Sequence, residues 1–482
     1  QVTVAVFRER EIVAIWPGYH DTALGMAFDI GSTTIAAHLV DLASGEALAS
    51  AGRMNPQIRF GEDLMSRVSY VMMHPGAEQQ MCEVVRTAVA ELILEVCAEA
   101  EQTPDNILDC TFVGNPIMHH LLLGLSPVEL GGAPFALATD SAVTVSAQRL
   151  NLGINPGARC YVLPCIAGHV GADCAAVVLS EAPHLREELT LLVDVGTNAE
   201  IVLGNRHRLL AASSPTGPAF EGAQISSGQR AAPGAIERVR IDPETLEPKF
   251  RIIGCDLWSD HPDFVNQTAG LGITGICGSG IIEVLAELYL AQVISSDGVV
   301  DGALSARSPR VIADGRTFAY LLHEGGIRIL VTQNDVRAIQ LAKAALYAGV
   351  RLLMDKLNVD SVDRIRLAGA FGSHIDVKYA MVLGLIPDCA LENVTSAGNA
   401  AGSGAHIALV DRNSREEIER EIRRIEKIET AVETRFQEHF VEAMAIPHKS
   451  ARFDELAKAV TLPLQTDAPS DSRLSGRRRR RR

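Results

Sequence analysis

The chain has 482 residues, of which 47% are hydrophobic, so it is long enough for about three domains with cores of their own. It carries 44 Lys and Arg against 59 Asp and Glu, which gives a net charge of −15 even though six Arg form the run at 477–482. A body this acidic repels phosphate backbones, which excludes nucleic acid as the main partner.

The cysteine content and the distribution of apolar residues indicate the compartment. The nine cysteines are scattered, the N-terminus lacks the layout of a secretory signal, and no stretch approaches the roughly 18 apolar residues of a membrane span. The sequence therefore predicts a cytoplasmic protein with reduced thiols and no contact with a membrane.

Strand and helix patterns divide the chain into successive segments. Residues 2–7 and 12–16 alternate like strands, and from Gly25 strands alternate with helices, which predicts an α/β fold. Helical periodicity predicts helices at 77–100, 281–293 and 335–357, and one alternating-charge helix at 415–460. The predicted units are a remnant of an upstream linker or middle domain at 1–22, domains at 23–186 and 187–412, a helical segment at 413–461, and a disordered tail at 462–482.

Two similar loops form an internal repeat. Asp29 to Thr34 and Asp194 to Asn198 each follow an apolar strand, and each is followed by another strand, a tight turn and a third strand. A single D-x-G-S/T stretch is commonly an ordinary strand and turn, but two equivalent copies favour a clamp for a nucleotide.

The residue types in these loops suit a magnesium triphosphate. Glycine lets the backbone turn sharply, and the N–H and O–H groups that follow it can face phosphate oxygens. The carboxylates of Asp29 and Asp194 would hold Mg²⁺ largely through water. The phosphate-facing residues are predicted to be Gly31, Ser32, Thr33, Thr34, Gly196, Thr197 and Asn198. A P-loop is excluded because no Gly-Lys dipeptide occurs.

Three further segments complete a known order of motifs. Residues 168–176 and 398–402 read as two connecting helices of small residues, and 367–372 as a strand that enters a glycine-rich turn. This order resembles the superfamily of acetate and sugar kinases, heat-shock ATPase chaperones and actin. The resemblance implies a duplicated actin-like ATPase fold, with two similar domains around a nucleotide cleft. It also implies an adenosine site at Gly369, Ala370, Phe371 and Gly372.

Longer sequence motifs indicate a particular family within this superfamily. They are Asn55-Pro56-Gln57, Gly61-Glu62-Asp63 and the stretches 114–124, 217–223 and 275–280. With them the chain, from Gly25 to about Val410, is similar to the ATP-dependent reductive activators of corrinoid proteins. That family implies an ATPase coupled to electron transfer, which returns a Co(II) corrinoid protein of a methyltransferase system to Co(I).

The resemblance also implies cofactors, partners and residue roles. ATP and Mg²⁺ are expected, with Asp194, Asp29 and Asp173 as catalytic residues and Gly217, Glu221 and Gly222 beside the nucleotide. Family members carry an N-terminal ferredoxin domain with a 2Fe-2S cluster as electron donor, but no C-x4-C-x2-C motif occurs in this chain. The sequence leaves open whether the chain forms a homodimer.

Three other functions remain open at this point. The same clamp serves small-molecule kinases that phosphorylate sugars or carboxylates. It also serves actin-like or chaperone-like scaffolds that the nucleotide switches. An activator of acyl-CoA dehydratases is a near relative, although the chain offers no helix with paired cysteines for its cluster.

Overall fold

The computed structural model describes residues 1–463, apart from the side chains of residues 370, 371 and 373. Nearly all of the tail predicted at 462–482 therefore lies outside the described residues. Within residues 1–463, no helix combines the length and the apolar character that crossing a membrane requires.

The first half of the chain builds a mixed six-stranded sheet in the order β5-β4-β3-β6-β8-β7. Its strands are β3 (Leu24–Ile30), β4 (Thr34–Asp41), β5 (Ala47–Met54), β6 (Ile107–Val113), β7 (Val143–Ser146) and β8 (Arg159–Val162). Central β3 is buried along nearly its whole length, as expected for a strand covered on both faces. It pairs antiparallel with β4 and parallel with β6.

The second half repeats this arrangement in a sheet of order β19-β18-β9-β10-β11-β20. Its strands are β9 (Thr190–Val195), β10 (Ala199–Gly204), β11 (Leu209–Ser214), β18 (Arg364–Ala368), β19 (Val394–Gly398) and β20 (Glu426–Lys427). Here β9 pairs antiparallel with β10 and parallel with β18, just as β3 pairs with β4 and β6. The predicted duplication of strand, loop, strand, turn and strand is confirmed.

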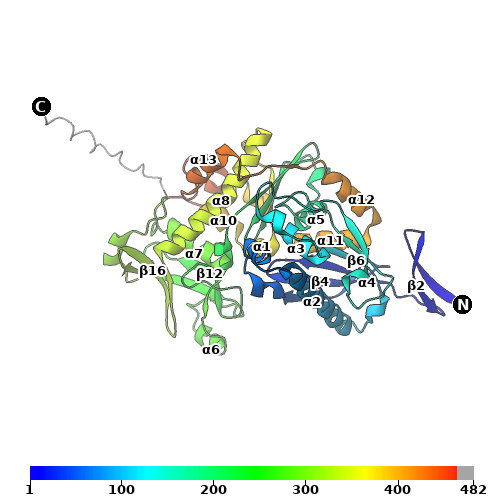
Figure 1. The fold of residues 1–482 in the computed structure, drawn as a ribbon. Helices are drawn as coiled ribbons and strands as arrows, with labels where there is room; N and C mark the ends of the chain where they lie inside the picture. Colours follow the sequence, from blue (N-terminus) through cyan, green and yellow to red (C-terminus); the bar gives the residue numbers. More distant parts are fainter. Residues whose placement is uncertain (464–482) are drawn as a thin grey trace.

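Long helices cover the outer faces of both sheets (Figure 1). The predicted helices are confirmed to within a few residues as α2 (Ala77–Glu99), α7 (Gly278–Leu290) and α8 (Gln333–Leu357). Helix α8 begins at a capping box of Thr332 and Asp335 and ends at Asn358, which takes a left-handed conformation. In the first half α1 (Leu64–Met73) and α3 (Pro116–Leu123) accompany α2.

Smaller elements lie at the margins. The hairpin of β1 (Val2–Phe7) and β2 (Glu11–Pro17) protrudes at the N-terminus in Figure 1, and Glu11 forms an ion pair with Arg159 of β8. The second half adds two three-stranded sheets. The remaining strands and short helices are β12 (Ala235–Ile241), β13 (Pro248–Ile252), β14 (Gly275–Ile276), β15 (Val311–Asp314), β16 (Thr317–Glu324), β17 (Arg328–Val331), α4 (Ala147–Leu150), α6 (Phe264–Thr268), α9 (Gly369–His374) and α10 (Val377–Leu383).

Two helices of small residues lie between the sheets. They are α5 (Ala172–Glu181) and α11 (Ala400–Val410), and their buried residues share one core with Ala27 of β3 and Leu192 of β9. A Cβ atom on Gly404 would overlap the backbone of Ala176, so only glycine permits this crossing. The predicted connecting helices are present, although α5 begins at Ala172 and not at Gly168.

The prediction of one helix across residues 415–460 is wrong. The segment forms α12 (Arg412–Glu421), strand β20, α13 (Thr434–Ala443) and α14 (Asp454–Ala457). The charge pattern favoured a continuous helix, but tertiary pairing overrides it because β20 adds to the free edge of β11 and α13 packs on α8.

The close crossing of α5 and α11 makes Gly404→Val a sensitive test of the fold. We expect the substitution to lower the free energy of unfolding by about 3 kcal/mol, because backbone atoms cannot move aside as a side chain would. Urea unfolding followed by circular dichroism measures the change. The matched control is Ser403→Val, at an exposed position of the same helix, which should change stability by less than about 0.5 kcal/mol. Equal effects of the two variants would contradict the crossing.

Candidate functional site

The two repeated loops occupy equivalent places at the ends of central strands. The first loop joins β3 to β4 and the second joins β9 to β10. A Cβ on Gly31 would lie 2.5 Å from the carbonyl oxygen of Thr34, and the Gly196 N–H donates to the Asn198 carbonyl at 3.1 Å. Glycine is therefore required for the turn of the first loop, as the sequence predicted.

The structure brings three predicted aspartates together. Asp29 is the second-last residue of β3, Asp194 is the second-last residue of β9, and Asp173 lies in the first turn of α5. Burial and the nearby charges of Asp173 and Asp194 raise the pKa of Asp29 to about 8. Burial and Asp194 raise the pKa of Asp173 to about 7, and burial raises the pKa of Asp194 to about 6. A half-buried group of carboxylates that repel one another needs a positive partner, which a magnesium nucleotide would bring.

A fourth acid, Glu200, was missed in the sequence. It lies on β10 directly opposite Asp194 of β9, and Ser213 of β11 hydrogen-bonds to it. Burial, followed by the charges of Asp173 and Asp194, raises the pKa of Glu200 well above its usual range. The sequence did contain a signal for Glu200. Two strands joined by a tight turn place residues 194 and 200 opposite each other, on the same face of the sheet.

Asn399 joins the second connecting helix to the acid group. Its side-chain oxygen accepts from the Gly402 N–H at 2.9 Å and so caps α11. Its side chain also hydrogen-bonds to the carboxylate of Asp29, which lowers the pKa of that acid and opposes the effect of burial. One residue therefore ties the start of α11 to the end of β3.

The first loop is held from behind by residues that the sequence did not assign. The guanidinium of Arg67, fully buried on α1, donates to the Ser32 carbonyl at 2.6 Å and to the Gly61 carbonyl at 2.9 Å. Burial lowers the pKa of Arg67 to about 10. The amide of Asn55 donates to the Gly31 carbonyl at 2.8 Å. The two sequence motifs that begin at Asn55 and Gly61 thus support the backbone of the first loop.

Residues 114–116 connect the first loop to α5. The carbonyl of Gly114 accepts from the backbone N–H of Ala172 at 3.0 Å and of Asp173 at 3.3 Å. A Cβ on Gly114 would lie 2.8 Å from the carbonyl oxygen of Ile30. This turn therefore fixes the distance between Asp173 and the first loop.

The second loop is supported by Thr216, which was not predicted, and by the predicted residues Gly217 and Glu221. The Thr216 hydroxyl donates to the carbonyls of Gly196 and Thr197, at 2.9 and 3.0 Å, and the Gly217 N–H donates to the Thr197 carbonyl at 2.9 Å. The Thr197 hydroxyl donates to Glu221 at 2.9 Å. Gly222 follows Glu221 in a left-handed conformation.

The expected adenosine segment lies against Asp194. Strand β18 leads directly into α9, so the predicted glycine-rich turn is a single residue, Gly369, with a φ of +83°. A Cβ on Gly369 would overlap the Asp194 carboxylate, which brings the backbone of this segment to the acid group. Gly372 packs on Leu367, while the side chains of Ala370 and Phe371 lie outside the described atoms.

Several predicted side chains stay available to a ligand. Those of Ser32, Thr33, Thr34 and Asn198 have no hydrogen-bond partner within residues 1–463, and none of the four is fully buried. Across the same residues, no group of three or more His, Cys, Asp or Glu side chains is arranged to hold a metal ion directly. All nine cysteines are buried and none forms a disulfide.

Comparisons with known proteins identify the fold and the family. A family model described as the RACo middle region matches residues 24–185, and one described as the C-terminal, ASKHA domain of RACo matches residues 188–457. ASKHA denotes the actin-like ATPase fold, so the predicted fold is confirmed. A solved structure of a reductive activator for corrinoid, iron-sulfur protein matches with a TM-score of 0.80 and 33% identity, over 93% of this chain and 70% of that one.

Two relatives have names that describe their activity. The corrinoid activation enzyme RamQ of Eubacterium limosum is 35% identical over 400 residues, which is 80% of this chain and 64% of that protein. The Co(II) methylated amine-specific corrinoid protein reductase of Methanosarcina barkeri is 24% identical over 414 residues, or 82% and 71% of the two chains. The chain thus spans less than two thirds of the length of the RamQ protein.

The acid group predicts how stability depends on pH in the absence of ATP and Mg²⁺. Because the pKa of Asp29 is raised, the folded protein holds a proton that the unfolded chain releases, so this contribution to stability is lost as pH rises toward about 8. We expect Asp29→Asn to have a higher Tm than the wild type at a pH of about 8, and the difference to shrink toward a pH of about 4. Differential scanning fluorimetry measures both. The exposed control Asp314→Asn should follow the wild type, and a pH-independent effect of Asp29→Asn would contradict the interpretation.

Proposed function

The chain belongs to the RACo family, and we propose that it is the ATP-hydrolysing portion of an activator that returns a corrinoid protein from Co(II) to Co(I). The observation that carries the proposal is the group of Asp29, Asp173 and Asp194 between two supported loops, in a chain 35% identical to a corrinoid activation enzyme. The name of the Methanosarcina barkeri relative, a Co(II) corrinoid protein reductase, supports the same direction of electron flow.

The nucleotide would lie between the two loops. The backbone N–H groups of the two loops that are not bonded within the loop, and the nearby hydroxyls, would face the phosphates, and the Gly369 backbone would accept the adenosine. Bound Mg²⁺ would supply positive charge to the β and γ phosphate oxygens. The carboxylates of Asp29 and Asp194 would orient the water molecules around the metal.

Asp173 has the best position to orient the attacking water. It lies at the N-terminal end of α5, and its own carboxylate accepts from the Cys174 backbone N–H at 2.8 Å, which fixes its direction. Its pKa of about 7 suits a group that accepts a proton near neutral pH. Glu221 acts one step further away, because it holds the Thr197 hydroxyl of the second loop.

Closure of the two halves on ATP would be coupled to electron transfer. Co(I) is a strong reductant, so a nucleotide-dependent change must favour its formation. The electron would come from a 2Fe-2S ferredoxin domain of the kind found in the family. The proposed protein partner is a corrinoid protein of a methyltransferase system.

The role of the acid group is tested by Asp194→Ala. We expect ATP hydrolysis to fall by about 10²-fold or more, because the metal waters lose an oriented carboxylate. A coupled enzyme assay for ADP measures the rate of ATP hydrolysis, and circular dichroism checks that the variant is folded. The control Asp314→Ala removes an exposed carboxylate in another sheet and should hydrolyse ATP as the wild type does. Normal turnover by the Asp194 variant would contradict the assignment.

The substrate is tested with a purified Co(II) corrinoid protein and titanium(III) citrate as electron donor. We expect the corrinoid protein to stimulate ATP hydrolysis, and its absorbance spectrum to change to that of Co(I) only with ATP and an intact Asp194. Stimulation of ADP formation by sugars, with no effect of the corrinoid protein, would contradict the proposal and favour a kinase.

A further inference from the structure

A cavity of about 410 Å³ lies in the first half of the chain, away from the two loops. The start of α2, the end of α3, strand β7 and the short helix α4 form its walls. The nucleotide loops contact the other end of α3, near Gly114, so the cavity is separate from the proposed ATP site. Its volume falls within the range of about 300 to 1,000 Å³ that is typical of small-molecule sites.

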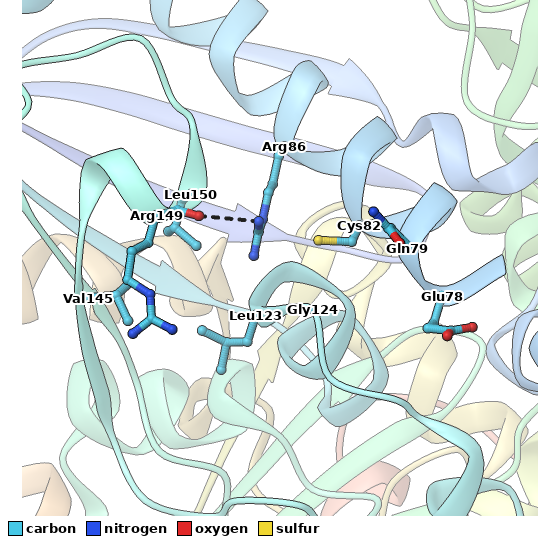
Figure 2. A pocket seen from close by; sticks show the side chains of 9 residues that line it. All are labelled: Glu78, Gln79, Cys82, Arg86, Leu123, Gly124, Val145, Arg149 and Leu150. Carbon is cyan, nitrogen blue, oxygen red and sulfur yellow. Dashed lines mark hydrogen bonds between the residues drawn. The ribbon is translucent and has the colours of Figure 1, made fainter. Parts of the chain in front are cut away.

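Two arginines reach this cavity from facing walls. Figure 2 shows the side chains of Arg86, from α2, and Arg149, from α4, both directed toward the space beside Leu123. Arg86 is fixed in place, because its Nε donates to the Leu122 carbonyl at 2.9 Å and its Nη1 to the Arg149 carbonyl at 3.4 Å. Its remaining N–H groups, and the whole guanidinium of Arg149, have no partner within residues 1–463.

The charge balance of the walls favours an anion with one negative charge. Glu78 is the one acid that lines the cavity among the described residues, and it lies on the side opposite Arg149 in Figure 2. Two guanidinium groups against one carboxylate leave a net charge of +1 in a chain whose overall charge is −15. A dianion would be repelled by Glu78, whereas a single carboxylate matches the fork of a fixed guanidinium.

The remaining walls suit an apolar body. Leu123, Val145 and Leu150 line the cavity beside the arginines. Burial raises the pKa of the Cys82 thiol, so this side chain stays neutral and adds no negative charge. A ligand with a carboxylate at one end and an apolar group at the other would therefore satisfy both parts of the surface.

We infer that this cavity binds a small monocarboxylate, with the carboxylate between Arg86 and Arg149 and an apolar group against Leu123, Val145 and Leu150. The site is built before the ligand arrives, since Arg86 is already held by two carbonyl groups and loses little freedom on binding. This inference does not depend on the proposed ATPase activity.

Isothermal titration calorimetry of the full chain with phenylacetate, in the absence of nucleotide, tests the inference. We expect saturable binding with a Kd below about 1 mM, and no binding of phenylacetamide, which has the same shape without the charge. Arg149→Gln should weaken phenylacetate binding at least about tenfold, because it removes one guanidinium group. Arg86 still holds the end of α3 in this variant. Val145→Phe keeps both arginines and should block the apolar part of the cavity.

The matched control is Arg10→Gln, which removes an exposed arginine of the N-terminal hairpin and should bind phenylacetate as the wild type does. Thermal melting confirms that each variant is folded. The inference is overturned if phenylacetate does not bind saturably, if phenylacetamide binds equally well, or if Arg149→Gln and Val145→Phe both retain wild-type affinity. The inference is also overturned if the protein binds inorganic phosphate but does not bind phenylacetate.

Discussion

The burial of Asp29, Asp173 and Asp194 beside one another is the constraint on which the arrangement of the site depends. Carboxylates buried this close together, two near the ends of strands and one in the first turn of α5, destabilise the fold unless a proton or a cation offsets their charge. The raised pKa values express that cost. Neighbouring residues hold two of the acids in place, since Asn399 hydrogen-bonds to Asp29 and the Cys174 N–H donates to Asp173.

The supports around the acids are mostly backbone contacts. Arg67 and Thr216 each hold one of the two repeated loops by its carbonyl groups. Glycine at Gly369 lets the chain pass directly over Asp194, and Gly404 lets α11 cross α5 at backbone distance. The small residues of this core let the two helices cross closely between the sheets.

Much of this arrangement could be predicted from the sequence, because the repeat is local. An apolar strand, an acid, a glycine and a hydroxyl define each loop within a few residues, and the second copy removes the ambiguity of the first. Arg67 and Asn399 could not be found in the same way, since Ser32 and Asp29, the site residues that they contact, lie 35 or more positions away. The segment after residue 411 was misread for a similar reason, because alternating charge favours a helix locally while the edge of β11 recruits a strand.

That misread segment links the two halves of the molecule. Helix α12 is held on the first half by three polar contacts, from Arg415 to Asp109 at 2.8 Å, from Tyr161 to Glu419 at 2.9 Å and between His184 and Glu417 at 2.6 Å. Strand β20 then extends the second sheet, and the Thr430 hydroxyl donates to the Ser213 carbonyl at 2.9 Å. Ser213 in turn holds Glu200, the cross-strand neighbour of Asp194. A continuous set of contacts therefore joins the outer face of one half to the acid group of the other. The acid group itself takes Asp29 and Asp173 from the first half and Asp194 from the second.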